Sequence, residues 1–130
     1  MSAGTSAVAL GDMTAANGNY SVAMGVSTTA NGQASYAEGY HTHALEHFTH
    51  AEGYYTIASG RYSHAEGYYT IAHGNSQHVQ GKYNIEDSTR EKYAHIVGNG
   101  ESETERSNAH TVDWNGLGWY AGGLKVGGTG

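Results

Sequence analysis

A short motif closed by glycine returns every 14 residues along the first part of this 130-residue chain. Its copies share one register, which is marked by Gly11, Gly25, Gly39, Gly53, Gly67 and Gly81. A self-match at a fixed period of this length indicates stacked coils, in which each repeat packs only against its neighbours. The period therefore restricts the chain to a solenoid type of fold before any single residue is considered.

One unit reads T-x-A-x-G-x-x-S-x-A-x-G-x-x, as in residues 56–69. The repeated positions alternate with variable ones, and alternation is the period of a β-strand. Because the repeated residues are small, the two layers of a coil can lie closer than the ~10 Å of ordinary stacked sheets. Glycine suits corners that need a positive φ or a close backbone approach. We therefore expect one flattened coil per unit, with parallel hydrogen bonds to the next coil.

The variable positions of the second half of each unit point out of the coil. On the first coils they carry the apolar side chains of Val8, Leu10, Val22 and Met24. A thin interior of Ala and Thr buries little apolar area, so a single roll would be only marginally stable. The pattern thus predicts an oligomer whose interface covers these four side chains.

On the later coils the same outward positions become polar. They carry His50, Glu52, His64, Glu66 and His78. A buried carboxylate must be paired, and a neighbouring imidazole can pair it. If this face lines a three-fold axis, we expect a polar network on that trimer axis, with the pKa of His50 and His64 raised by the carboxylates. The alternative is that this part of the face is in contact with water.

Metal binding is a competing interpretation of the histidines. His41-Thr42-His43 is a His-x-His sequence, and three copies at an axis would offer six nitrogens to one ion. However, His41 falls on a turn and His43 on the first-half face. The expectation is that the chain has no metal site and no cofactor.

Tyrosines recur at the corners of the expected coils. The candidates for ligand contact are Tyr40, Tyr54, Tyr55, Tyr68 and Tyr69. Exposed aromatic side chains suit contacts with sugars or proteins. The alternative is that these rings pack between coils or between neighbouring chains.

The repeat changes toward the C-terminus. We expect an irregular start at residues 1–5, a roll at 6–107 with insertions near 84–92 and 99–107, and a β cap at 108–130. The first insertion is charged and predicts a surface loop. Asn115-Gly116 predicts a hairpin turn. The expected cap side chains on the open end of the roll are Trp114, Trp119 and Tyr120.

Composition excludes several classes of function. The net charge of −6 argues against nucleic acid as a partner, and the absence of cysteine argues against disulfides and thiolate metal sites. No apolar run is long enough to cross a bilayer. Carboxylates that recur with the coil indicate architecture rather than the specific pair that a glycosidase needs. We expect no enzymatic activity.

The motif Ser21-Val22-Ala23-Met24-Gly25 and its neighbours resemble the head repeats of trimeric autotransporter adhesins, the YadA-like heads, over roughly residues 6–81. This resemblance implies a left-handed parallel β-roll with three chains around one axis. The variant at residues 63–67 and the tail at 108–123 resemble phage tail-fibre and tail-appendage proteins. In those proteins such a segment precedes a C-terminal chaperone domain that cleaves itself off.

The sequence therefore predicts a structural and host-attachment segment of a phage tail fibre or receptor-binding appendage, located in the virion tail. A glycan or protein of the host cell surface would be its partner, without insertion into the membrane. Two alternatives remain open: the head of a bacterial trimeric surface adhesin, located at the cell surface, and the non-catalytic part of a tail-associated glycan hydrolase.

Overall fold

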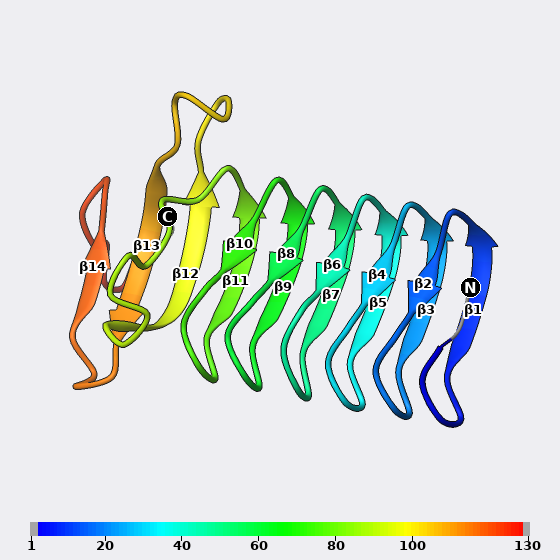
Figure 1. The fold of residues 1–130 in the computed structure, drawn as a ribbon. Coiled ribbons are helices and arrows are strands. Elements are labelled where there is room, and N and C mark those ends of the chain that lie inside the picture. Colours follow the sequence, from blue (N-terminus) through cyan, green and yellow to red (C-terminus); the bar gives the residue numbers. More distant parts are fainter. Residues whose placement is uncertain (1–2, 129–130) are drawn as a thin grey trace.

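The computed structural model describes residues 3–128, which form fourteen β-strands and no helix. The coils lie side by side along one axis, as Figure 1 shows. The longer strand of each coil is odd-numbered: β1 (Val8–Asp12), β3 (Val22–Val26), β5 (Tyr36–Tyr40), β7 (His50–Tyr54), β9 (His64–Tyr68) and β11 (His78–Lys82). The shorter strand is even-numbered: β2 (Ala15–Ala16), β4 (Thr29–Ala30), β6 (His43–Ala44), β8 (Ile57–Ala58) and β10 (Ile71–Ala72).

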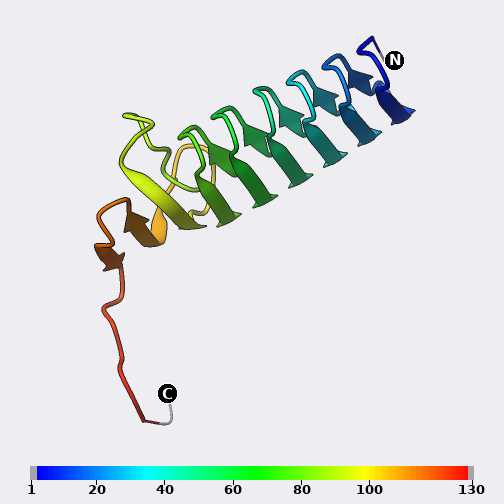
Figure 2. The same cartoon turned by 90° about the horizontal axis from the view of Figure 1, so that it is seen from below.

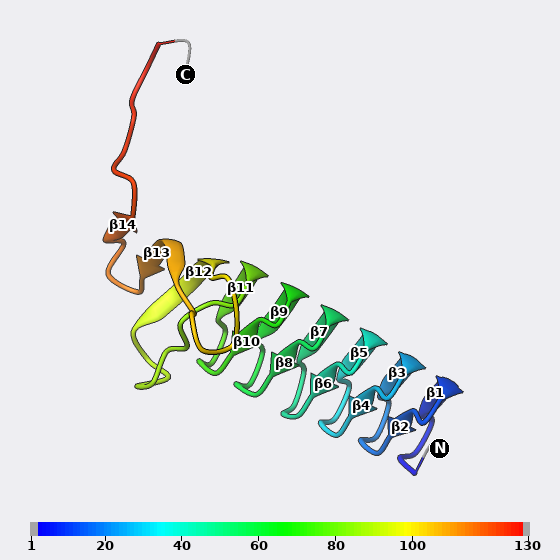
Figure 3. The same cartoon turned by 90° about the horizontal axis from the view of Figure 1, so that it is seen from above.

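The two kinds of strand form two sheets, seen almost edge-on in Figure 3. The odd strands β1 to β11 are followed in one nine-stranded sheet by β12 (Tyr93–Asn99), β13 (Asn108–Asp113) and β14 (Gly118–Tyr120). The even strands form a five-stranded sheet. Successive coils pair in parallel and in register, so that Ala37 lies beside Ala51 and Gly39 beside Gly53. The expected all-β solenoid of 14-residue coils is confirmed.

Alanine fills the space between the two sheets. Its side chains are fully buried in every coil, from Ala16 to Ala72. Buried Ser and Thr hydroxyls flank them, and several donate to a backbone carbonyl three residues earlier, as Ser21 does to Gly18 at 2.6 Å. At the C-terminal end larger side chains take over, because Val79 and Ile96 continue the alanine row and are also fully buried.

Glycine is required at two kinds of position in each coil. Gly53 has a φ of 112°, and a Cβ placed there would lie 2.2 Å from the carbonyl oxygen of Gly67 in the next coil. A Cβ at Gly60 would lie 2.1 Å from the carbonyl oxygen of Gly74. The expected close backbone approach is confirmed in both cases, but Gly53 lies within β7 and only Gly60 lies in a turn between strands.

Further corners adopt a left-handed conformation without glycine. Tyr55 and Tyr62 have φ values of 53° and 61°, and a residue in this conformation follows every seven positions from Ser6 to Tyr83. Such a conformation costs roughly 1–2 kcal/mol for a residue with a Cβ. Turns were expected at several of these positions, but their left-handed conformation was not, because the residues that occupy them vary in type from Ser to Tyr.

The sheet is closed by antiparallel strands. β12 still runs parallel to β11, with Gly81 beside Gly98, whereas β13 turns back along β12 and β14 turns back along β13. The expected turn between β13 and β14 is present, with Gly116 at a φ of 84° and the Asp113 carboxylate accepting from the N–H groups of Asn115 and Leu117. Figure 2 shows that the segment after β14 leads away from the roll.

Residues 1–2 of the expected irregular start and residues 129–130 of the expected cap lie outside the described residues. Between residues 3 and 128 there is no helix of the length and apolar character that crossing a bilayer requires.

Candidate functional site

The outward face of the odd strands carries two parallel rows of side chains. The first, the imidazole row, consists of His50, His64, His78 and His95, which occupy matching positions in β7, β9, β11 and β12. The second, the carboxylate row, consists of Glu38, Glu52 and Glu66 in β5, β7 and β9. Parallel in-register pairing places every member beside its equivalent in the next coil, so the residues that the sequence predicted for a polar network do share one face.

Within the two rows, His64 and His78 each lie closest to the carboxylate of the preceding coil. His64 Nε2 lies 3.0 Å from Glu52 Oε1 and 4.0 Å from Glu66 Oε2. His78 Nε2 lies 3.1 Å from Glu66 Oε1. The result is a zigzag of acid and base groups that connects neighbouring coils.

The rings of the imidazole row stack on one another. The centroids of His50 and His64 are 4.6 Å apart and those of His64 and His78 are 4.8 Å apart, with nearly parallel planes. Tyr36 contacts His50 edge-on at 4.9 Å and so ends the row on the N-terminal side. These side chains remain about one third exposed in the single chain, for example 34 % for His64 and 33 % for Glu66.

The expectation of a raised pKa at His50 is wrong. Desolvation by burial lowers the pKa of His50, and the neighbouring His64 lowers it further, outweighing the carboxylates. Its Nε2 atom is 3.8 Å from Glu38 Oε1, too far for a hydrogen bond, and no other described group accepts or donates there. Burial and the neighbouring His78 likewise lower the pKa of His95.

In the carboxylate row, the pKa of Glu66 is shifted in the direction that favours ionisation. Burial alone would raise the pKa of Glu66. The lowering contributions, of which the hydrogen bond from His78 is the largest, outweigh burial and hold this pKa below its usual value. Neutral His50 and ionised Glu66 near pH 7 give the face a negative character.

The apolar residues predicted for the trimer axis occupy the same outward face, nearer the N-terminus. Val8 pairs with Val22, and Leu10 with Met24, in β1 and β3. Val8 and Leu10 are 44 % and 56 % exposed in the single chain, whereas Val22 and Met24 are half-buried. The face thus changes along the roll from apolar to histidine and glutamate.

The tyrosines form two columns along one corner of the roll. In the first, Tyr54 stacks on Tyr40 and on Tyr68, with centroids 5.1 Å apart on both sides. In the second, Tyr55 stacks on Tyr69 at 4.7 Å. Because neighbouring rings cover their faces, these tyrosines present edges and hydroxyl groups to solvent.

The second column continues into Tyr83. The centroids of Tyr69 and Tyr83 are 4.9 Å apart, and the guanidinium of Arg106 lies 5.9 Å from the Tyr83 ring centroid. Desolvation, followed by the interaction with Tyr68, raises the pKa of Tyr83 to about 12. The Tyr83 hydroxyl therefore stays protonated around physiological pH.

The His-x-His sequence does not gather ligands. His41 lies at a corner with a φ of 52° and stacks on Tyr55 at 4.5 Å, whereas His43 belongs to β6 in the other sheet. Burial, followed by the neighbouring His41, lowers the pKa of His43. Among residues 3–128, no third histidine or carboxylate joins these two in a cluster of ligand atoms.

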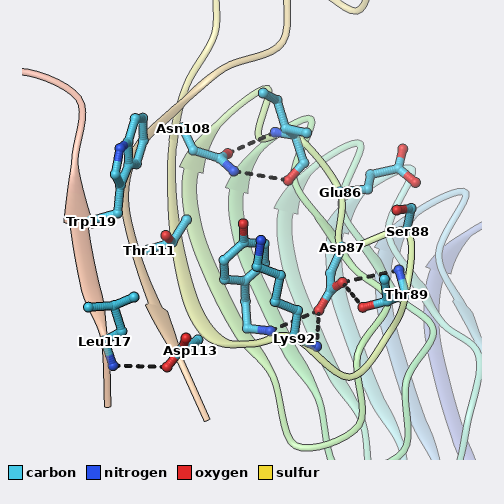
Figure 4. A pocket seen from close by; sticks show the side chains of 12 residues that line it. Glu86, Asp87, Ser88, Thr89, Lys92, Asn108, Thr111, Asp113, Leu117 and Trp119 are labelled. Carbon is cyan, nitrogen blue, oxygen red and sulfur yellow. Dashed lines mark hydrogen bonds between the residues drawn. The ribbon is translucent and has the colours of Figure 1, made fainter. Parts of the chain in front are cut away.

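The aromatic residues expected to cap the roll stay at the surface. Trp114 and Trp119 are each 53 % exposed, and Tyr120 is 42 % exposed with its ring stacked on His110. Trp119 and Leu117 stand at one wall of a cavity of about 570 Å³, opposite the segment from Glu86 to Thr89, as Figure 4 shows. The open end of the roll is thus closed by the paired strands β13 and β14, with these side chains overhanging the cavity.

The connection between β11 and β12 is exposed at Ile85 and at residues 88–92, in line with the expected surface loop, but one of its charged side chains is buried. Asp87 in its middle is only 2 % exposed. Its carboxylate accepts hydrogen bonds from the backbone N–H groups of Lys92 and Tyr93, both at 2.9 Å, and from the Thr89 hydroxyl at 2.7 Å. A charged insertion suggests solvent exposure, and nothing in the sequence distinguishes Asp87 from the charged residues around it.

Two asparagines extend the five-stranded sheet beyond β10. The side-chain amide of Asn84 accepts from Ile71 N at 2.8 Å and donates to Ile71 O at 3.0 Å, as a neighbouring strand would. The side-chain amide of Asn108 pairs with Ile85 in the same way: it accepts from the Ile85 N–H at 2.8 Å and donates to the Ile85 carbonyl at 3.2 Å. Side chains thereby replace the backbone of a missing coil.

Comparison with known families bears on the coils alone. Residues 2–28 and 51–76 match the YadA head domain repeat, in two copies. No curated protein and no solved structure matches the chain. The repeats together with the β-solenoid fit a YadA-like head, and YadA head repeats are a structural adhesin domain.

Proposed function

We propose that the chain is a segment of a homotrimeric, YadA-type head that serves display and host attachment, carried by a phage tail fibre or receptor-binding appendage. The observation that carries the proposal is the continuous outward face of the odd strands. It combines exposed Val8 and Leu10 with a histidine–glutamate zigzag in parallel register. A face of this kind gains stability when like copies cover it, because the thin alanine interior alone buries little apolar surface.

The solution mass tests the trimer. Light scattering on the untagged protein is expected to give three times the chain mass of 13.7 kDa. A stable single-chain mass would contradict the proposal, because Val8 and Leu10 would then stay exposed.

A matched pair of substitutions tests which face forms the contact. Val22→Lys places a charge on the face of the odd strands, and Ile57→Lys places one on the outward face of β8; both positions are half-buried. We expect Val22→Lys to reduce the mass to that of one chain and Ile57→Lys to leave it unchanged. The reverse result would move the interface to the other sheet.

Binding assays distinguish a head that belongs to a phage appendage from one that belongs to a bacterial adhesin. The trimer is expected to bind bacterial cells or their surface polysaccharide, which would support the phage appendage. The second candidate is the head of a bacterial surface adhesin, which the matched YadA head repeats favour. Binding to an animal matrix protein in place of bacterial cells would support that candidate.

A role beside a glycan hydrolase remains a third candidate. In the proposed function the carboxylates serve packing, because Glu52 and Glu66 already contact His64 and His78 in consecutive coils. Turnover of a host polysaccharide by the isolated chain would contradict a purely structural role.

A further inference from the structure

The zigzag on β7, β9 and β11 gathers groups that are typical ligands of transition metals. The ligand atoms of His64, Glu66 and His78 all lie within 4.8 Å of one another. Glu66 is central, because its two oxygens are 4.0 Å from His64 Nε2 and 3.1 Å from His78 Nε2. Glu52 is also within reach, at 3.0 Å from His64 Nε2. Imidazole nitrogen and carboxylate oxygen are ligands that Zn²⁺ and similar ions take in proteins.

The spacing of these atoms is close to that of a coordination sphere. With bonds of about 2.1 Å, ligand atoms around a tetrahedral Zn²⁺ lie about 3.4 Å apart. The His64–Glu52 and His78–Glu66 separations, 3.0 Å and 3.1 Å, fall slightly below this value. The His64–Glu66 separation of 4.0 Å exceeds it by about half an ångström. Small rotations of exposed side chains are enough to equalise them.

Open space lies beside the carboxylates. Gly53, Gly67 and Gly81 have no side chains, and together with Glu52, Glu66 and Gln80 they line a shallow hollow of about 440 Å³. An ion held by the two glutamates therefore has room for water ligands, and it can enter from solvent in the single chain.

The carboxylates also have an electrostatic reason to bind a cation. Glu52 and Glu66 occupy directly paired positions on β7 and β9, where like charges destabilise a sheet. The nearest lysine along this sheet, Lys82, pairs with Glu101 instead. A divalent ion between the two glutamates would replace their repulsion by attraction.

We propose that each chain binds one divalent transition-metal ion of the Zn²⁺ class through His64 Nε2, His78 Nε2 and the Glu66 carboxylate, with Glu52 as a fourth ligand. The two imidazoles stack with planes only 9° apart, so one ion cannot lie in both ring planes as they stand. One ring turns about its Cβ–Cγ bond on binding, a torsion that is broad for histidine.

A second triad, of His50, Glu52 and His64, overlaps the first and shares His64 with it. The two triads therefore exclude each other, and one ion per chain is the expected stoichiometry. The triad around Glu66 is favoured because Glu66 contacts both of its histidines, whereas His50 is held at the other end by the edge of the Tyr36 ring.

Metal titration of the untagged full chain, stripped with a chelator, tests the site. Calorimetry with ZnCl₂ and metal analysis after dialysis should both give one ion per chain. Glu66→Gln and His78→Gln should each weaken Zn²⁺ binding at least tenfold. The matched control is His95→Gln: His95 lies in the same row, but its strand carries Val97 where β5, β7 and β9 carry glutamate. The affinity of this variant for Zn²⁺ should stay unchanged.

Retained affinity in Glu66→Gln or His78→Gln would overturn the proposal, as would an equal loss in His95→Gln. NMR of the unmodified protein supplies a test that needs no variant. Added Zn²⁺ should shift the ring signals of His64 and His78 and leave those of His73, which pairs with Glu86 away from this face, in place; shifts confined to other histidines would contradict the site.

The inference does not depend on association, because one chain supplies all four side chains. A chain that binds Zn²⁺ and has the mass of a monomer would contradict the proposed trimer and leave the metal site standing. A trimer that binds no Zn²⁺ would do the opposite.

Discussion

In the coils up to β11 each strand lies beside its own equivalent from the next coil, whereas the segment from Tyr83 to Asn108 has no equivalent beyond it. Backbone pairing holds the coils together, and the alanines between their sheets, from Ala16 to Ala72, are at 0 % exposure. In the closing segment β12 still pairs through its backbone, but the chain around it is held by side chains, above all the amides of Asn84 and Asn108 and the carboxylate of Asp87.

The difference teaches that repetition removes the need for amide and carboxylate side chains in the interior, where the buried polar residues from Thr14 to Thr70 are all Ser or Thr. The backbone N–H and C=O groups of a coil are paired by the equivalent strand of the next coil, so only small residues are needed between the sheets. Where the repeat ends, these groups must be paired by other means, since an unpaired buried backbone group is costly. Buried Asn, Asp and Gln therefore concentrate at the end of the roll, where Gln77 also donates to Tyr93 O at 2.9 Å.

The largest effect is expected from breaking the stacking of coils. Gly53→Ala would force a Cβ to 2.2 Å from the Gly67 carbonyl oxygen at a φ of 112°. We expect the free energy of unfolding to fall by about 3 kcal/mol or more, measured by denaturant titration. The control is Gly122→Ala, because a Cβ there meets no atom within 4 Å; a similar loss in both variants would show that coil contact is not the cause.

Breaking the closing segment should have the next largest effect. Asp87→Asn keeps the shape of the side chain but removes the charge that accepts from Tyr93 N and Lys92 N. Hydrogen bonds to a charged group contribute roughly 1.5–3 kcal/mol, so we expect a loss of about 2 kcal/mol in the free energy of unfolding. The coils should be unaffected, and hydrogen exchange in β3 to β7 should change less than in β12.

The same residue predicts a dependence on pH. Burial would raise the pKa of Asp87, but hydrogen bonds from Tyr93, Thr89 and Lys92 outweigh it and hold the pKa below 3.8. Its contribution to stability is complete above the unfolded pKa and is lost as the pH falls through the lower folded pKa. The stability difference between the protein and Asp87→Asn should therefore shrink below about pH 4; a constant difference would contradict the depressed pKa.

Two buried threonines inside the coils allow a matched pair of substitutions. We expect smaller changes in the free energy of unfolding here, with opposite signs for the two positions. The buried hydroxyl of Thr42 has no hydrogen-bond partner among the described residues, whereas that of Thr49 donates to Glu46 O at 2.7 Å. Thr42→Val should raise the free energy of unfolding by about 1 kcal/mol and Thr49→Val should lower it by about the same amount. Equal signs in thermal melting would show that the interior does not distinguish the two hydroxyls.

The smallest effect is expected at a left-handed corner. Ala34 is exposed, has a φ of 51° and donates its N–H to Asn19 O at 2.8 Å. Ala34→Gly would relieve this strain but would also increase the freedom of the unfolded chain. We expect a net gain of about 0.5 kcal/mol, and a clear loss would mean that the corner is not strained.

How far the sequence predicts this molecule follows the same division. The 14-residue period was sufficient for the coils, the parallel register and the placement of His50, His64 and Glu66 on one face, because a repeat fixes what lies beside what. The left-handed corners escaped prediction because residues as different as Ser27 and Tyr62 occupy them. Burial of Asp87 escaped because its partners are backbone groups, which no side-chain pattern reveals.

The contacts within the candidate site were also only partly predictable. The alternation of His64 and Glu66 indicated a shared face, but their pairing across coils depends on side-chain torsions that a sequence does not specify. The lowered pKa of His50 depends in the same way on the ring stacked against it and on burial, and so the sign of the shift was wrong when only the carboxylates were considered.

In-register pairing gives the roll a natural unit of length. Duplicating or deleting any one of the 14-residue coils between β1 and β11 would leave every remaining strand with the same kind of neighbour, while the asparagines and Asp87 would still close the end. Lineages of such proteins could change their reach in steps of about 4.8 Å, the spacing of adjacent strands, without redesigning a core. The number of 14-residue repeats in the chain therefore sets the length of the roll.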